Sequence, residues 1–512
     1  MRKLLLVVIV LFVRVAAAQD QGYQLPPKEI ADLVLAKPTP GVTVNSKGEW
    51  MLLKETDGYP SVEELARPEL RIAGFRINPN NFSPSRQSFV SNLVLKHLPS
   101  GKTYKIAGLP ASLKADNIVW NPGENKIAFT HTTASQVDLY VLDVATQQAA
   151  KINKQPLNVI LGAGFLWVDD HTLLYKTIVQ PAAAAPPKPM MPKGPAVQEN
   201  LGKAAPSRTY QDLIRSPYDE QLFEFYATAQ LVKNVNGVET NIGKPAIYHS
   251  ISVSPDKQYL LVRTLHKPFS YLVRATGFPS VVSIWDGKGQ VVKVLAELPS
   301  TETSPSGFDN VQNVPRSFDW RDDEPATITW CEPLDSGLIR KKTEYHDAVY
   351  ALSAPFTGSP RLLFKTTMRF RNVQWGNASL ALVSEGLSGK QLSRVHRFDP
   401  STGNMELLWE RNTTDAYNNP GNPVTIKNKY GRNVVFTTQN NTRLLMNNTT
   451  GSSPKGDLPF LAGFDLKTKQ TEILWRCAEG SFEVIADVMD PEQLVLLTRR
   501  ESQTEVPNYF IK

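Results

Sequence analysis

The chain reads Val119-Trp120-Asn121-Pro122-Gly123-Glu124-Asn125-Lys126-Ile127-Ala128-Phe129 near the end of its first quarter. A β-rich run ends at a tryptophan, a polar turn follows, and a second β-rich run begins, which is the pattern of a β-hairpin. The same pattern recurs in four further stretches, at residues 166–175, 253–262, 318–330 and 373–383. Trp120 and Trp167 lie 47 residues apart, a spacing typical of one unit in a repeat architecture.

A second hairpin pattern follows several of these stretches. It consists of a strand, an Asp-containing turn and another strand, and occurs at residues 139–147, 283–290, 397–404 and 463–470. The two hairpins together make one four-stranded antiparallel sheet, and a ring of such sheets buries faces that one sheet leaves exposed. The sequence therefore predicts an all-β fold, a β-propeller of about seven four-stranded blades, with eight as the alternative.

The N-terminal segment has the pattern of a secretory signal peptide. Arg2 and Lys3 precede the apolar residues 4–13, and small residues follow at 16–18. We expect a signal peptide at 1–18, an N-terminal extension at 19–42 and the propeller at 43–512, with export to the periplasm or the extracellular space. The alternative is an uncleaved N-terminal anchor. No later run is apolar enough to span a membrane.

A Pro-rich insertion around residues 179–208 interrupts the repeat. Long ordered loops on rigid scaffolds are often functional, and a poorly ordered surface insertion is the alternative. Residues 209–228 are expected to lead back into the ring as a helix.

Charge and cysteine content exclude few functions. The net charge is +7 without any Lys/Arg-rich run, so nucleic-acid binding is not expected. The two cysteines, Cys331 and Cys477, would either pair in an oxidising compartment or remain buried thiols.

The sequence contains no recognisable catalytic motif. A nucleophile elbow requires Gly-x-Ser-x-Gly, and the nearest run, at residues 451–455, ends in Lys455. None of the seven histidines has the spacing of a zinc site, and no Gly-rich phosphate loop occurs. We therefore expect no catalytic residue, metal or cofactor within this sequence.

A group of basic residues lies in predicted connections or near strand ends. A positively charged propeller mouth would favour acidic peptides, whereas the alternative is solvated charge at blade edges. The candidate substrate-binding residues are Arg263, His266, Arg274, Arg340, Lys341, Arg369 and Arg371.

Five stretches together resemble one known group of proteins. Residues 60–74, 193–206, 266–273, 318–327 and 497–510 resemble the propeller of the glutamyl-endopeptidase-like members of the prolyl oligopeptidase family. The resemblance implies that the propeller restricts entry to peptides, and that a following α/β-hydrolase domain carries the Ser-Asp-His triad. Because the sequence stops at Lys512, where that domain is expected to start, no triad residue is assigned.

Three hypotheses follow for function. The first is a non-catalytic, substrate-gating propeller of a serine peptidase, inactive alone and partnered by a separate hydrolase domain. The second is a stand-alone exported propeller that binds peptides or a protein partner. The third, an unrelated propeller enzyme such as a lyase or glycosidase, needs a central Asp/Glu/His cluster that the sequence does not show.

Overall fold

The computed structural model describes residues 26–180, 183–190, 210–438 and 441–512. Strands account for 48% of the chain and helices for 7%, so the all-β class predicted from the hairpin patterns is confirmed. The predicted signal peptide and most of the predicted insertion lie outside the described residues. Within the described ranges, no helix is long and apolar enough to cross a membrane.

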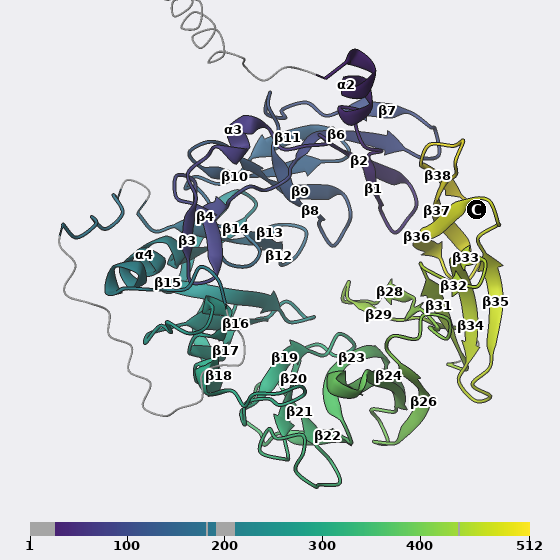
Figure 1. The fold of residues 1–512 in the computed structure, drawn as a ribbon. Coiled ribbons are helices and arrows are strands. Elements are labelled where there is room, and N and C mark those ends of the chain that lie inside the picture. The colour runs from purple at the N-terminus through teal and green to yellow at the C-terminus, as the bar shows by residue number, and fades with distance from the viewer. Residues whose placement is uncertain (1–25, 181–182, 191–209, 439–440) are drawn as a thin grey trace, which may run out of the picture.

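Antiparallel sheets follow one another in chain order around a common centre, as the blades of a propeller do (Figure 1). We call this arrangement the ring of sheets. The last sheet contacts the first, because a Cβ on Gly48 would lie 2.7 Å from Cε of Met489. No strand pairing among the described residues joins these two sheets. Closure by backbone pairing is therefore absent there, and the number of about seven blades stays a prediction.

The N-terminal part of the ring consists of two large sheets. The first is joined between its two halves by the single pair Val90 and Ala115. Its strands are β1 (Gly41–Val44), β2 (Trp50–Thr56), β6 (Val90–His97), β7 (Thr103–Lys105), β8 (Ala115–Trp120), β9 (Lys126–Thr132), β10 (Val137–Asp143) and β11 (Gln148–Lys151). The second contains β12 (Phe165–Trp167), β13 (Thr172–Ile178), β14 (Ala229–Val235), β15 (Val238–Val253), β16 (Tyr259–Leu265), β17 (Ser280–Asp286) and β18 (Val291–Leu298).

The long strand β15 belongs to both halves of the second sheet. Its first half pairs with β14 and its second half with β16. A register shift between Tyr248 and Ser250 leaves His249 as an extra residue, which is the geometry of a β-bulge.

Smaller sheets complete the ring. Two four-stranded sheets contain β19 (Arg316–Trp320), β20 (Thr327–Pro333), β21 (Asp347–Ser353) and β22 (Arg361–Thr366), then β23 (Arg369–Asn377), β24 (Leu380–Leu387), β25 (Leu392–Phe398) and β26 (Met405–Asn412). The next contains β27 (Asn422–Pro423), β30 (Thr437–Thr438), β31 (Arg443–Asn448), β34 (Phe460–Asp465) and β35 (Thr471–Arg476), and the last β36 (Phe482–Asp490), β37 (Val495–Glu501) and β38 (Asn508–Ile511). The additional pairs are β28 (Thr425–Lys427) with β29 (Asn433–Val435) and β32 (Ser452–Ser453) with β33 (Gly456–Asp457).

The four predicted second hairpins are confirmed as β10–β11, β17–β18, β25–β26 and β34–β35. Each turn contains an aspartate whose Oδ1 accepts a backbone hydrogen bond from two or three residues further along. The donors are Thr146 N to Asp143 and Lys288 N to Asp286, Ser401 N to Asp399 and Lys467 N to Asp465, all at 2.9 Å. The recurring aspartate is therefore explained by turn formation.

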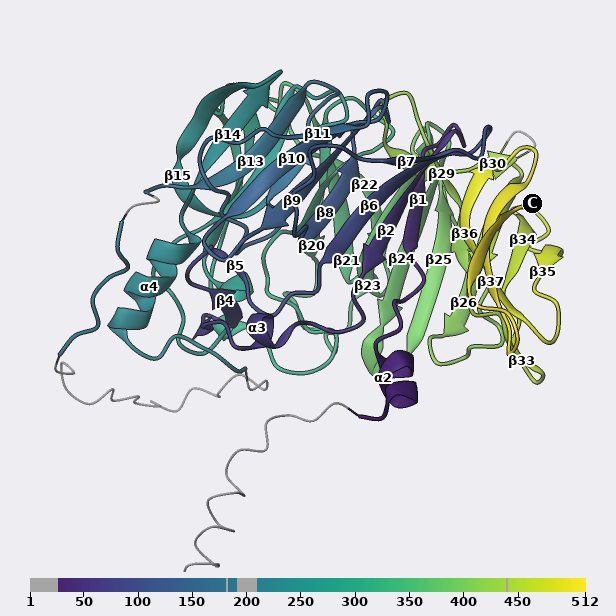
Figure 2. The same cartoon turned by 90° about the horizontal axis from the view of Figure 1, so that it is seen from above.

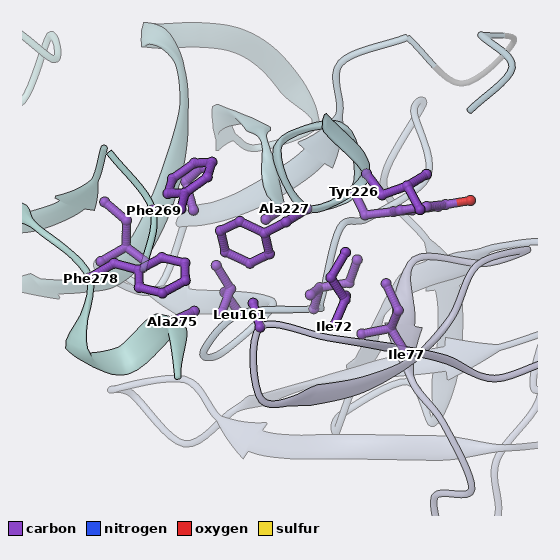
Figure 3. Close-up of a cluster of buried hydrophobic side chains, with 14 of the residues drawn as sticks. Ile72, Ile77, Leu161, Tyr226, Ala227, Phe269, Ala275 and Phe278 are labelled. Carbon is purple, nitrogen blue, oxygen red and sulfur yellow. The ribbon is translucent and has the colours of Figure 1, made fainter. Parts of the chain in front are cut away.

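Helix α4 (Pro217–Ala227) confirms the predicted helical lead in residues 209–228. Ser216 caps it, accepting a 3.2 Å hydrogen bond from Asp219 N. Its buried residues pack on the β16–β17 connection and on a small sheet, forming the cluster that includes Ile72, Tyr226 and Phe269 (Figure 3). The small sheet consists of β3 (Leu70–Ile72), β4 (Phe75–Asn78) and β5 (Ser83–Pro84). The other helices in the described ranges are α2 (Lys28–Val34), α3 (Val62–Leu65), η1 (Ala275–Gly277), η2 (Thr301–Thr303) and η3 (Ser388–Lys390).

The ring has two different ends. Figure 2 shows α3, α4 and β4 at one end and β29 at the other. We call these the α4 end and the hairpin end.

Both cysteines are free and buried. The buried-thiol interpretation is therefore confirmed, and burial raises the pKa of Cys331 to about 12, which makes it a poor nucleophile.

Candidate functional site

The hairpin β28–β29 reaches from the β31 sheet toward the centre of the ring (Figure 1). Its turn is built locally: Asn428 Oδ1 accepts hydrogen bonds from Tyr430 N at 2.9 Å and from Arg432 N at 3.1 Å. Gly431 has a φ of +73°, a backbone conformation that favours glycine. The turn is therefore fixed by its own residues and can be presented as a unit.

The turn makes polar contacts with three other parts of the ring. Each partner lies in, or at the start of, a turn of a different strand pair: β8–β9, β15–β16 and β19–β20. The contacts are the ion pair of Lys427 with Glu124, the hydrogen bond from Arg432 to the Val253 carbonyl, and the 2.7 Å hydrogen bond from Asn428 Nδ2 to the Asp322 carbonyl. The β28–β29 hairpin therefore connects the turns of three other strand pairs at the hairpin end.

The pKa values of three carboxyl groups near the hairpin are shifted from their ordinary values. Burial raises the pKa of Asp322 to about 6, although the positive charge of Arg432 lowers it. Burial also raises the pKa of Asp487. For Glu124, burial acts in the same direction, but hydrogen bonds from Lys427 and Ser46 outweigh it and lower the pKa.

The predicted basic residues lie toward the α4 end. β16 runs from the β15–β16 turn at the hairpin end to Leu265, so the β16–β17 connection, with His266 and Arg274, lies at the opposite end and packs on α4. The end of β23 lies beside β29, because a Cβ on Gly376 would be 3.5 Å from the Val435 carbonyl. Its first residue, Arg369, therefore lies toward the α4 end.

Arg369 lies inside a buried charge network rather than on the surface. It is 1% exposed. Its guanidinium forms a bidentate ion pair with Asp335 at 2.7 and 3.1 Å, contacts Asp347 at 3.1 Å and donates to the Asp309 carbonyl at 2.6 Å. Burial opposes ionisation of Asp335, but hydrogen bonds from Arg369 and His346 outweigh it and lower the pKa. Arg369 holds three segments together in this structure.

Arg371 is two residues further along β23 and is exposed. Its side chain pairs with Asp309 at 2.9 Å. Burial opposes ionisation of Asp309, but backbone N–H groups of Gly389 and Ser388 and the Arg371 side chain outweigh it and lower the pKa. Arg340 and Lys341 are exposed in the β20–β21 connection, which contains Asp335.

Arg274 lines an open cavity of about 370 Å³ at the same end. Residues of the β16–β17 connection and of the segment after β18 surround it, including Thr301 and Asn310. The Arg274 guanidinium lies 4.8 Å from the ring centroid of Tyr210, a cation–π contact. Asn310 Oδ1 accepts a 3.0 Å hydrogen bond from Ile339 N, which connects the cavity wall to the loop of Arg340.

The remaining two predicted residues do not line this cavity. Arg263 is half-buried and its Nε donates to Ser280 Oγ at 3.0 Å. His266 is exposed, and its Nδ1 lies 2.7 Å from the carbonyl oxygen of Lys267. The structure brings Arg274, Arg340, Lys341 and Arg371 to one end as exposed cations, and the substrate-binding role of the set stays a prediction.

The hairpin residues did not emerge from the sequence as candidates. Asn428 and Gly431 carry a local turn signal, but their partners lie more than one hundred residues away in the chain. No group of three His, Cys, Asp or Glu side chains that could hold a metal ion occurs in the described part of the chain.

No protein-family model matches the chain. It is 33% identical over 522 residues to proteins named "Probable glutamyl endopeptidase, chloroplastic" from Oryza sativa subsp. japonica and Arabidopsis thaliana. Both alignments cover 96% of this chain, and they cover 55% of the rice protein and 54% of the Arabidopsis protein.

Solved structures align more loosely. A structure described as one of two prolyl endopeptidases has a TM-score of 0.39 at 10% identity, covering 92% of this chain and 54% of that chain. An oligogalacturonate lyase with manganese has a TM-score of 0.39 at 13% identity, covering 80% and 95%. At these scores the alignments decide nothing about fold or function. By sequence, the chain is a relative of two plant proteins named probable glutamyl endopeptidases and spans about half the length of each.

Proposed function

We propose that the ring of sheets restricts and positions peptides for a serine peptidase of the prolyl oligopeptidase type. In this proposal an α/β-hydrolase domain supplies the chemistry of hydrolysis. The observation that supports it most is the β28–β29 hairpin, which contacts three other parts of the ring at one end. Sequence similarity to proteins named as endopeptidases supports the same class of function.

The α4 end is the proposed side of substrate contact. Arg274, Arg340 and Lys341 are exposed there, and Arg274 lines the 370 Å³ cavity. Arg371 is partly neutralised by Asp309. Exposed cations around a cavity attract acidic peptides through electrostatic complementarity.

Reconstitution tests the proposal directly. The purified chain is mixed with a fragment of the rice relative that covers the region this chain does not match, and cleavage of glutamate-containing peptides is measured. We expect no cleavage by the chain alone and cleavage by the mixture. The full-length rice protein is the positive control. If it cleaves the peptides while the mixture remains inactive and shows no association, the proposal is wrong for this chain.

Opening the hairpin should relax the restriction on peptide size. In the double variant Lys427→Gln with Arg432→Gln, an ion pair and a charge-assisted hydrogen bond are lost, and the latter alone contributes about 1.5–3 kcal/mol. We expect amide exchange at residues 428–432 to accelerate about tenfold or more. In the reconstituted enzyme, long peptides should be cleaved faster relative to short ones.

Lys429→Gln is the matched control for this variant. Lys429 lies in the same turn and contacts the ring of Tyr430 rather than another sheet. It should leave both exchange and size selection unchanged. Equal behaviour of the control and the double variant would show that the bridging contacts do not set access.

A further inference from the structure

A cavity of about 120 Å³ lies between β13 and the second half of β15. The loop of Gly162, Ala163 and Gly164 forms one wall, and Lys176 and His249 line it from the two strands. Since one water occupies about 30 Å³ in the liquid, the space suits a few waters or one small anion. It is too small for a folded peptide segment.

Lys176 is buried at this cavity and has no carboxylate partner among the residues that the structure describes. The residue is 5% exposed, and its ammonium donates to the Leu161 carbonyl. An ammonium has three N–H donors, so this carbonyl does not satisfy the group. Burial lowers the pKa of Lys176 to about 8, which still leaves it mainly charged at pH 7.

His249 reaches the cavity because it is the extra residue of the β15 bulge. Its Nδ1 is buried and has no hydrogen-bond partner among the described residues. Arg263 lies on β16 opposite Ser250, the next residue. Burial, together with the positive charges of Arg263 and Lys176, lowers the pKa of His249 to about 4.

Two of these three groups, Lys176 and Arg263, are cations at pH 7, and the imidazole of His249 beside them is neutral. In the described ranges no Asp or Glu forms an ion pair with Lys176, His249 or Arg263, although many other Lys and Arg side chains there pair with a carboxylate. Burial lowers the pKa of Arg263 as well. Buried charges are ordinarily paired, because removing them from water costs several kcal/mol each. The missing partner is therefore a negative charge.

We propose that this cavity binds a small oxygen anion, a phosphate-like oxyanion or a free carboxylate, between the Lys176 ammonium and the His249 imidazole, with Arg263 adding positive charge from the next strand. The site is independent of the proposed peptidase function. The anion offsets the buried charge and gives the orphaned Nδ1 and the remaining ammonium donors a partner. By linkage, a bound anion raises the pKa of Lys176 and His249, so binding takes up protons.

Titration calorimetry on the purified chain tests the site, with inorganic phosphate and acetate as separate ligands at constant ionic strength. We expect one saturable site. Stronger binding of phosphate identifies an oxyanion site, and stronger binding of acetate a carboxylate site. At pH 8, titrations in two buffers of different ionisation heat should show proton uptake, which a general effect of salt does not produce.

Lys176→Met and Arg263→Gln should each weaken binding about tenfold or more. Arg263→Gln decides the test if Lys176→Met does not fold. Lys233→Met is the matched control, since Lys233 also donates to a backbone carbonyl, that of Gly287 at 3.1 Å, away from the cavity. Absence of saturable binding of both ligands to the unaltered chain, or an equal loss in the Lys233 variant, would overturn the proposal.

Discussion

Replacing Arg369 by methionine is expected to lower the free energy of unfolding by about 3–5 kcal/mol. Asp335 and Asp347 are both 0% exposed, and each contacts the Arg369 guanidinium at 3.1 Å or less. Methionine fills much of the volume but leaves two buried carboxylates short of a cation. His346 and Arg316 remain as partial partners. Denaturant unfolding followed by fluorescence and by circular dichroism measures the loss.

Arg371→Met is the control for that variant. Arg371 is on the same strand, but its side chain is 44% exposed, and its partner Asp309 keeps hydrogen bonds from the N–H groups of Ser388 and Gly389. Its loss should therefore cost less stability than the loss of Arg369. An Arg369 variant as stable as the Arg371 variant would contradict the assignment of a structural role.

The pH dependence gives a second readout for Arg369. Because the folded-state pKa of Asp335 is lowered, its stabilisation is present above the unfolded pKa of about 4 and is lost as the pH falls through the folded value. Without Arg369, burial raises that pKa, so the variant gains stability on acidification. The difference between the two proteins should be largest at neutral pH and shrink toward pH 4.

Replacing Asp322 by asparagine is expected to raise the free energy of unfolding at pH 8 by up to about 3 kcal/mol. Burial raises the folded-state pKa of Asp322 to about 6, from an ordinary value of 3.8. The folded state therefore binds a proton more tightly than the unfolded state. The carboxylate destabilises the fold above pH 6, and this cost disappears as the pH falls toward 4. Asparagine has no such cost at any pH.

The measurement is chemical unfolding between pH 4 and pH 8. The unaltered chain should lose stability from this group as the pH rises through 6, and Asp322→Asn should lack that component. The hydrogen bond from Asn428 to the Asp322 carbonyl involves the backbone and remains in the variant. Asp256→Asn is the control, because its Oδ1 accepts hydrogen bonds within its own turn, which asparagine can also accept. Identical pH profiles for the chain and Asp322→Asn would contradict the prediction.

Features with a local cause could be predicted from the sequence. The Asp-containing hairpins follow from the ability of an aspartate side chain to bond the N–H groups of its own turn, and four of them occur where the pattern indicated. The helix at Pro217–Ala227 begins with a Ser-Pro pair typical of a helix start.

Features that depend on contacts between distant parts of the chain could not be predicted from the sequence. Arg369 was expected to be an exposed cation beside a strand, and nothing in its neighbours along the chain indicates that Asp335 and Asp347 surround it. The hairpin tip has a recognisable turn sequence, but its role depends on Glu124 and Val253, which approach it only in the folded ring. The isolated charge of Lys176 likewise depends on which carboxylates the fold keeps away.

Strand β15 has a mechanical consequence. Because this single strand hydrogen-bonds to β14 along one half and to β16 along the other, the strands on its two sides separate only if one of these two ladders of hydrogen bonds breaks. Such connected strands open as one cooperative unit in hydrogen exchange. The amides of β13, β14, β16 and β17 should therefore share one opening free energy, and stress applied at either side of the bulge at His249 is transmitted through it.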